Sequence, residues 1–250
     1  MVTGAGKGIG LAITRALVAE GVHVVAGSRT LSPELESLQS GGAVTFVGVD
    51  LASAEGSTRL LEVAAARGGV DILVNVGAVT PRTSGFAAIT DEEWVSSFNL
   101  TFLSAVRTVR AALPQLIGRG GGSIVTISSV NAFLPDPTVI DYSAAKAALT
   151  NFSKSLSKEL GGKGIRVNTV SPGPVQTELW LGEHGVASTL AKANGSAADD
   201  IVDSAAAGAE TGRFTFPEEV ADLVLFLVSD RAGNVTGADF VIDGGLIKTL

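Results

Sequence analysis

Cysteine is absent from the 250 residues of this chain, and histidine occurs only twice, at His23 and His184. The lack of cysteine excludes a disulfide framework, a thiol nucleophile and a cysteine-based zinc site. Two histidines so far apart predict no metal cluster. Charged residues make up only 17% of the chain, and the net charge of -7 is opposite in sign to the surface of a nucleic-acid-binding protein. No apolar run is long enough to span a bilayer, and no basic and then apolar leader precedes Thr3. We therefore expect a cytoplasmic protein that binds no metal, nucleic acid or membrane.

The chain does have the apolar residues that a large core requires. Hydrophobic residues account for 46% of the sequence, which argues against disorder. Apolar strand candidates alternate with helical patterns, as is typical of a parallel sheet covered by helices on both faces. Strands are predicted at residues 22–26, 44–49, 72–76, 123–128, 166–170 and 239–242. Helices are predicted at residues 10–20, 56–67, 91–119, 142–160 and 217–229. The pattern predicts a single α/β domain over residues 1–250.

A glycine-rich segment near the start of the chain indicates what kind of ligand this domain binds. Gly4, Gly8 and Gly10 stand between a short apolar strand and an amphipathic helix. They would let the backbone turn tightly and approach a pyrophosphate, which then rests on the helix N-terminus. The apolar run at 22–26 follows, as a second parallel strand should. The order predicts a dinucleotide-binding domain of the Rossmann type, with a doubly wound parallel sheet.

A second motif supplies acid/base chemistry. Tyr142 and Lys146 are four residues apart, which places both side chains on one face of a helix, and Ser129 lies thirteen residues upstream. An ammonium close to a phenol favours the phenolate, so Lys146 is expected to lower the pKa of Tyr142. A phenol near its titration point can exchange a proton with a substrate oxygen. Ser129 would hydrogen-bond the same oxygen and hold it in place.

Together these segments resemble the short-chain dehydrogenase/reductase family over essentially the whole chain. The resemblance rests on Thr3-Gly4-Ala5-Gly6-Lys7-Gly8-Ile9-Gly10, Asn75-Val76-Gly77-Ala78, Asn99, Ser129, Tyr142, Lys146 and Pro172-Gly173. It implies a nicotinamide-dependent oxidoreductase that acts on a carbonyl/alcohol pair. It also implies four catalytic residues, in which Asn99 holds a water of the proton relay and Lys146 binds the nicotinamide ribose: Asn99, Ser129, Tyr142 and Lys146.

The chain departs from the family pattern at two places. Only Met1 and Val2 precede Thr3, where the first strand of the family normally carries several apolar residues, so either the natural chain starts upstream of Met1 or those residues were trimmed. Val76 stands where the family usually has a second asparagine that helps to tie the central strands together. Asn75 is retained, and the small Gly77 still permits close approach of the cofactor ribose.

The choice of cofactor is predicted from charge at the end of the second strand. An acidic residue there would bind the adenosine 2′-hydroxyl and repel a 2′-phosphate. The chain has Ser28-Arg29-Thr30 instead, and Arg29 can offer a planar fork to the phosphate. Lys7, inside the glycine loop, could reach the same group. NADP(H) is therefore the expected cofactor, with NAD(H) possible, while Asp50 and Leu51 follow the third strand where the family contacts the adenine.

The remaining cofactor contacts are predicted after the sixth strand. By resemblance, the Val175 backbone and the Thr177 hydroxyl hold the nicotinamide carboxamide, in a loop at the carboxyl end of a strand where ligands are expected. The complete predicted cofactor site is Gly4, Lys7, Gly8, Ile9, Gly10, Ser28, Arg29, Thr30, Asp50, Leu51, Asn75, Gly77, Tyr142, Lys146, Pro172, Gly173, Val175 and Thr177.

The segment at about 178–214 is the least regular part of the chain and is expected to be a substrate lid. It begins directly after Thr177 and contains Trp180 and Leu181, which could fold over an apolar substrate. Two helices outside this segment, at 91–119 and 142–160, carry more apolar surface than one sheet face covers. By family resemblance they predict a homotetramer, with a dimer as the second choice.

The sequence thus predicts an NADP(H)-dependent enzyme that interconverts a carbonyl, such as a ketone or a 3-oxoacyl group, and a secondary alcohol. Within the family, the chain is most similar in general pattern to 3-oxoacyl-(acyl-carrier-protein) reductases and NADP-dependent carbonyl reductases. Alternatives are an NAD-dependent alcohol or sugar dehydrogenase, a nucleotide-sugar epimerase or dehydratase, and a non-catalytic NADP-binding sensor. The substrate is not determined at this level, because a fold does not fix it.

Overall fold

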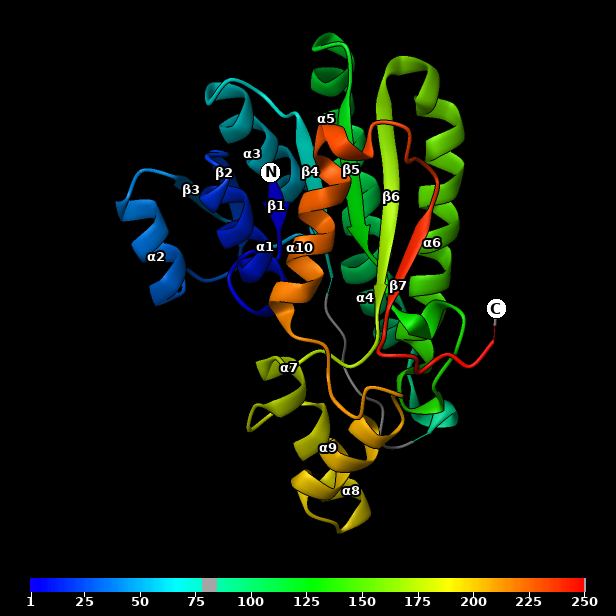
Figure 1. Ribbon diagram of the computed structural model, residues 1–250. Helices are drawn as coiled ribbons and strands as arrows, with labels where there is room; N and C mark the ends of the chain where they lie inside the picture. The colour runs from blue at the N-terminus through cyan, green and yellow to red at the C-terminus, as the bar shows by residue number, and fades with distance from the viewer. Residues whose placement is uncertain (78–84, 250) are drawn as a thin grey trace.

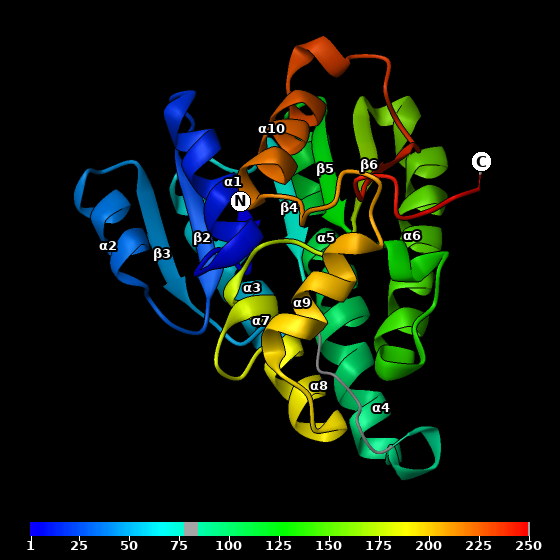
Figure 2. The ribbon, with the colours of Figure 1, turned by 60° about the horizontal axis from the view of Figure 1, so that its bottom comes forward.

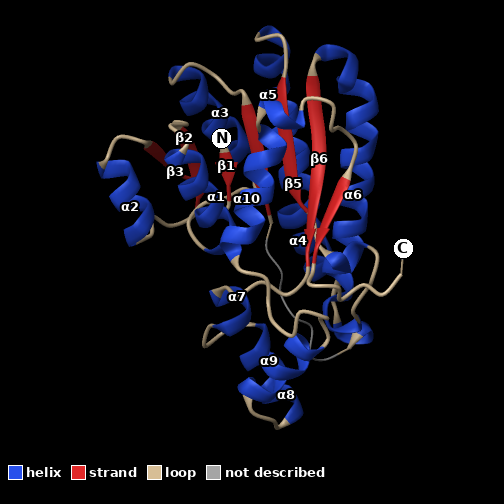
Figure 3. Cartoon of the chain, in the orientation of Figure 1, coloured by secondary structure: helices blue, strands red, loops and turns tan. Residues whose placement is uncertain are grey.

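A computed structural model describes residues 1–77 and 85–249, and its centre is a sheet of seven parallel strands (Figures 1 and 3). The strand order is β3-β2-β1-β4-β5-β6-β7, so the chain winds outward in both directions from β1. The predicted doubly wound sheet of the Rossmann type is therefore confirmed. The strands are β1 (Val2–Thr3), β2 (Val24–Ser28), β3 (Val44–Gly48), β4 (Ile72–Val76), β5 (Gly122–Ile127), β6 (Ile165–Pro172) and β7 (Asp239–Ile242).

Successive strand residues face two separate hydrophobic cores, one on each side of the sheet. In β2, Val24 and Ala26 pack into the first core and Val25 packs into the second. In β4, Val74 and Leu73 are divided in the same way, as the period of two in a strand requires. The first core is covered by α1 (Gly8–Ala19), α2 (Pro33–Ser40) and α10 (Pro217–Val228), and the second by α3 (Ala54–Ala66), α5 (Ser104–Gly118) and the end of α6 (Ile140–Leu160).

Helix boundaries follow the predictions to within two residues except for the helix expected at 91–119. That stretch forms α4 (Asp91–Phe98), a π-helical turn η2 (Asn99–Leu103) and α5. Helix α2 was not predicted. Its signals are a Ser32 hydroxyl that accepts from the Leu35 N–H and a proline at the first helical position.

Strand β1 comprises two residues of the given sequence, and the Thr3 side chain adds a hydrogen bond to the neighbouring β4. The N–H of Val76 donates to Thr3 Oγ1 over 2.9 Å, which ties β1 to the end of β4. The amino group of Met1 donates to the Ile72 carbonyl over 2.7 Å, and burial lowers the pKa of that amine to about 5. The bond between Val76 and the Thr3 side chain links β1 to β4 in a chain that lacks the family's second asparagine.

Three short helices lie beyond the carboxyl ends of the strands and overhang one edge of the sheet (Figure 2). They are α7 (Glu178–Leu181), α8 (Val186–Asn194) and α9 (Ala198–Ala207), and they occupy most of the segment that the sequence marks as irregular. Val186, Ala187 and Ala191 of α8 are buried. None of the helices in the described ranges combines the length and the apolar character needed to cross a membrane.

Candidate active site

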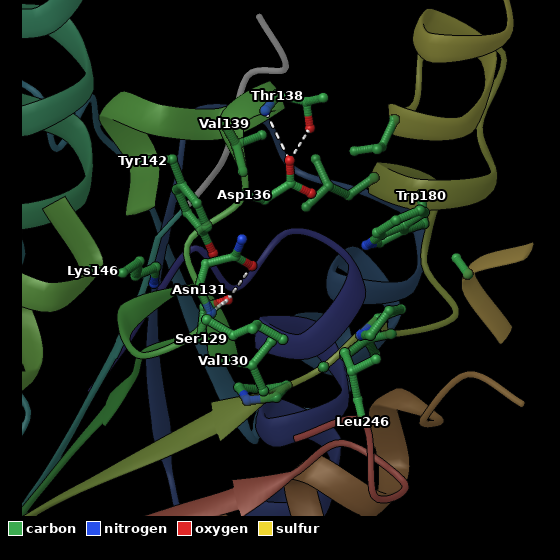
Figure 4. Close-up of a pocket in the computed structure, with 18 of the residues that line it drawn as sticks. Ser129, Val130, Asn131, Asp136, Thr138, Val139, Tyr142, Lys146, Trp180 and Leu246 are labelled. Carbon is green, nitrogen blue, oxygen red and sulfur yellow. Dashed lines mark hydrogen bonds between the residues drawn. The ribbon is translucent and has the colours of Figure 1, made fainter. Parts of the chain in front are cut away.

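A cavity of about 580 Å³ opens at the carboxyl ends of β4, β5 and β6. It brings together segments that are far apart in the sequence, including β5, the start of α6, the loop after β6 and helices α7 to α9 (Figure 4). Ligands of doubly wound sheets bind at this edge. Predicted site residues that line the cavity are Ile9, Gly77, Ser129, Tyr142, Lys146, Pro172, Gly173, Val175 and Thr177.

Ser129 and Tyr142 meet in this cavity because Ser129 follows the end of β5 by two residues and Tyr142 lies in the first turn of α6. The Ser129 hydroxyl accepts from the backbone N–H of Asn131 over 3.2 Å, which caps a short 3₁₀ turn and fixes the serine. Burial raises the pKa of Tyr142 to about 12, and a hydrogen bond with Ser129 opposes part of that increase. Tyr142 therefore keeps its proton at neutral pH.

Lys146 lies one helical turn after Tyr142 and is almost fully buried. Its Nζ donates to the Ile127 carbonyl over 2.6 Å and lies 5.4 Å from the centroid of the Tyr142 ring. Burial lowers the pKa of Lys146 to about 7. The prediction that Lys146 lowers the pKa of Tyr142 is wrong for the chain without ligands. Both groups are desolvated, so each favours its neutral form, and burial dominates the tyrosine.

The fourth predicted catalytic residue, Asn99, lies on the chain segment between α4 and α5. It starts the π-helical turn η2, and its Oδ1 accepts a hydrogen bond from Arg107 over 2.9 Å. Asn99 is not among the described residues that line the cavity. Its side chain thus braces the helix, and the predicted role in a proton relay stays a prediction.

The glycine-rich turn has the geometry that a bound pyrophosphate requires. Gly4 and Gly8 have φ values of 62° and 53°, which favour glycine, and a Cβ on Gly10 would lie 2.2 Å from the Gly4 carbonyl oxygen. In the described part of the chain, no side chain caps the N-terminus of α1 and no acidic residue occupies its first turn. Its free N–H groups and the positive end of the helix dipole fit a phosphate.

The turn after β1 packs directly on the turn after β2. A Cβ on Gly6 would lie 2.8 Å from Ser28 Oγ, which itself donates to the Thr30 carbonyl over 2.7 Å. Lys7 and Arg29 therefore project from adjacent turns, and both side chains are exposed. Two further predicted contacts follow β3: an exposed Asp50, whose Oδ1 caps the Ala52 N–H, and a half-buried Leu51.

Asn75, at the carboxyl end of β4, is buried at 4% exposure, and neither atom of its amide has a hydrogen-bond partner within the described ranges. Gly77 follows it closely, and a Cβ there would lie 3.5 Å from Lys146 Nζ. Ala78 lies outside the described residues. The unpaired amide and the small Gly77 fit a site in which a polar ligand completes the edge of the sheet.

The loop after β6 reaches back to the glycine turn. A Cβ on Gly8 would lie 3.2 Å from the Thr177 methyl group, so the turn predicted to hold the pyrophosphate contacts the loop predicted to hold the nicotinamide. Trp180 lines the cavity, with its ring 5.1 Å from that of Phe214. Leu181 does not line it among the described residues and is 43% exposed, and its neighbour Leu179 lines it instead.

Several residues that line the cavity were not predicted as site residues. Asn131, Asp136 and Thr138 line it, and no sequence motif marks them as site residues. Asp136 does cap the 3₁₀ turn η4 (Pro137–Val139), but it also faces the cavity. Leu246 comes from the C-terminal segment after β7, and only the tertiary fold brings it to the cavity. Within the described residues, no cluster of three or more histidine and acidic side chains could hold a metal ion.

Comparisons with known proteins agree with this geometry. The family model described as enoyl-(acyl carrier protein) reductase matches residues 4–247. The chain is 34% identical to the uncharacterised oxidoreductase YvrD of Bacillus subtilis, covering all of this chain and 96% of that protein. It is 33% identical to human dehydrogenase/reductase SDR family member 4, covering 98% and 86%.

Among solved structures, the crystal structure of L-sorbose reductase from Gluconobacter frateurii, complexed with NADPH and L-sorbose, superposes with a TM-score of 0.90 at 36% identity. The match covers all of this chain and 96% of that one. The predicted enzyme class is confirmed: an oxidoreductase that interconverts a carbonyl and an alcohol with a nicotinamide cofactor. The chain belongs to the short-chain dehydrogenase/reductase family.

Proposed function

We propose that the protein reduces a ketone to a secondary alcohol with NADPH. The observation that carries the proposal is the convergence of Ser129, Tyr142 and Lys146 in one cavity that is continuous with the glycine-rich turn. Proton transfer to a developing alkoxide requires a hydroxyl that donates the proton and a second group that holds the oxygen, and Tyr142 and Ser129 supply these next to the buried amine of Lys146. When bound, NADPH supplies the hydride for the carbonyl carbon.

The protonation state of Tyr142 favours reduction. With a pKa raised to about 12, the phenol carries its proton at neutral pH and can donate it to the substrate oxygen. Ser129 holds that oxygen with a second hydrogen bond. Lys146, which is fixed by the Ile127 carbonyl, lies beside Gly77 at the place where the cofactor ribose is expected.

The preference for NADPH is supported by two cations at the predicted adenosine end. Arg29 and Lys7 project from adjacent turns, and Arg29 can pair with a phosphate through two parallel hydrogen bonds. The similar L-sorbose reductase is complexed with NADPH. An acidic residue at the position of Arg29 would instead favour NADH.

We also propose that α7 to α9 act as a lid and that α4 to α6 form the surface between subunits. The lid helices wall the cavity through Leu179, Trp180, Val186 and Leu190. A row of aromatic rings in tilted and edge-to-face contact runs along α4, η2 and α6, formed by Trp94, Phe98, Phe102 and Phe152. The neighbouring Val95 is 59% exposed. Such an exposed apolar helix pair suits association of identical subunits into a tetramer.

The proposed activity is tested by following the absorbance of NADPH and NADH with a panel of ketones, aldehydes and 3-oxoacyl esters. Ketone-dependent oxidation of NADPH supports the proposal, and a stronger response with NADH supports the NAD-dependent alternative. Tyr142→Phe removes the proton donor with little change in volume and should reduce turnover by roughly 10²–10⁴. Turnover close to wild type in this variant would refute the role of Tyr142.

A further inference from the structure

The cavity contains a polar contact that the proposed reaction leaves unexplained. The hydroxyl of Ser129 donates to Asn131 Oδ1 over 3.1 Å, in addition to accepting from the Asn131 N–H (Figure 4). A serine hydroxyl has one proton, so a Ser129 that donates to Asn131 cannot at the same time donate to Tyr142 or to a substrate. Binding of a carbonyl oxygen at Ser129 must therefore break this bond.

The exchange has a consequence for the choice of substrate. When the Ser129 proton moves to a carbonyl oxygen, Asn131 Oδ1 loses its donor in a half-buried position, which is unfavourable unless another donor replaces it. A hydroxyl group on the carbon next to the carbonyl supplies that donor. The two oxygens of such a ketone are on adjacent carbons. The carbonyl oxygen can therefore face Ser129 Oγ while the hydroxyl faces Asn131 Oδ1, which lies 3.1 Å from Ser129 Oγ. A simple ketone leaves the amide oxygen unpaired.

The carboxylate of Asp136 is a second hydrogen-bond acceptor in the cavity. Asp136 Oδ1 accepts from the N–H and the hydroxyl of Thr138, over 2.8 and 2.7 Å, while Oδ2 accepts nothing from the described residues. Figure 4 shows the Asp136 carboxylate pointing into the cavity, with Tyr142 on one side and Trp180 on the other. Oδ2 is therefore free to accept a hydrogen bond from a ligand hydroxyl.

Among the described residues, the charges around the cavity favour an uncharged substrate over an anionic one. Asp136 and Lys146 are the only charged side chains among the described residues that line it. Lys146 is buried at 2% exposure and already donates to the Ile127 carbonyl, so it offers no free cation to a carboxylate or a phosphate. Asp136 would repel such a group.

We propose that the substrate is an uncharged α-hydroxy ketone whose α-hydroxyl donates to Asn131 and whose more distant hydroxyl donates to Asp136. The inference rests on the proposed function and names its substrate class. The balanced reaction is the ketone plus NADPH and a proton giving a vicinal diol and NADP⁺. The hydride forms the new C–H bond at the carbonyl carbon. The oxygen takes its proton from Tyr142, which solvent then reprotonates.

The first test needs only the wild-type protein and a pair of substrates that differ by one hydroxyl, 1-hydroxy-2-butanone and 2-butanone. With NADPH, kcat/KM should be at least about tenfold higher for the hydroxy ketone, because a site built to pair a hydroxyl rejects the analogue that lacks it. Equal efficiency for the pair, or a 3-oxobutanoyl thioester as the best substrate, overturns the inference but leaves the proposed function standing. No NADPH oxidation with any carbonyl overturns both.

The second test assigns the preference to Asn131. In Asn131→Ala the Ser129 proton is no longer held, so kcat/KM should rise for 2-butanone and fall for the hydroxy ketone, reducing their ratio by about tenfold. A merely structural role would lower both values together and would overturn the assignment.

Asp136 is tested with a ketohexose, which has hydroxyls beyond the α position. Asp136→Asn keeps an oxygen to cap the Thr138 N–H but removes the charged acceptor, and should raise KM severalfold for the ketohexose only. The matched control Thr138→Val removes one bond to Asp136 Oδ1 and keeps the carboxylate. Equal losses in both variants would show that Asp136 acts only as a cap.

Discussion

Buried Lys146 should make the stability of the ligand-free protein increase with pH, whereas an exposed lysine with an unshifted pKa would give no such dependence. Its ordinary pKa is 10.5, and burial lowers the pKa in the folded chain to about 7. Between these two values the unfolded chain holds the proton and the folded chain has released it. The free energy of unfolding must then increase as the pH rises, because the unfolded state binds more protons.

The expected size follows from the two pKa values. Each pH unit in this interval changes the free energy of unfolding by about 1.4 kcal/mol, which gives about 2 kcal/mol between pH 7 and pH 9 once the incomplete deprotonation near pH 7 is allowed for. Tyr142 acts only above pH 10, where its raised pKa makes stability fall.

The Lys146→Met variant isolates the lysine from the other titrating groups. It removes the titrating amine, keeps the apolar stem, and leaves the Ile127 carbonyl unpaired at a cost of about 1–3 kcal/mol that does not depend on pH. Urea unfolding of both proteins at pH 7, 8 and 9 gives the test. Wild type should gain about 2 kcal/mol relative to the variant over this range. Parallel curves, or a wild type that loses stability relative to the variant, would refute the account of Lys146 as a desolvated amine.

Three further predictions concern the cofactor, the lid and the assembly. Arg29→Ala should weaken NADPH binding by roughly tenfold or more while NADH binding changes little, and titration showing equal losses would contradict a 2′-phosphate contact. Hydrogen exchange in residues 178–214 should be fast in the free protein and slower with NADPH and substrate, and protection equal to that of β5 in the free protein would indicate a rigid insert. Sedimentation at micromolar concentration should show a tetramer, and Val95→Glu should shift it toward smaller species, whereas a wild-type monomer would contradict the proposed subunit surface.

The fold could be predicted from the sequence because its signals are local. Alternation of apolar strands with amphipathic helices fixed the doubly wound sheet, and the periods of two and 3.6 residues reflect which faces are buried. The spacing of Gly4, Gly8 and Gly10 identified the turn under the predicted pyrophosphate, since tight turns with positive φ need glycine. The four-residue spacing of Tyr142 and Lys146 was likewise enough to place both on one side of α6.

The properties of the active site depended on what surrounds those residues, which the sequence does not display. Spacing indicated that Lys146 would make Tyr142 more acidic, but burial raises the pKa of the tyrosine and lowers that of the lysine. Asn99 was grouped with them by resemblance, yet its side chain pairs with Arg107 in a π-helical turn. Desolvation is a sum over many distant neighbours, so no short motif contains it.

Only the tertiary structure decided which residues surround the substrate. Asn131 and Asp136 are polar residues in turns, and in the sequence they could not be distinguished from residues that merely cap those turns. Leu246 reaches the cavity from a segment more than a hundred residues after Ser129. The alternation of strands and helices and the buried face of each helix follow from repeated local patterns, which can be read directly from the sequence. A cavity is formed by side chains from several elements, and their positions exist only after the sheet has brought those elements together.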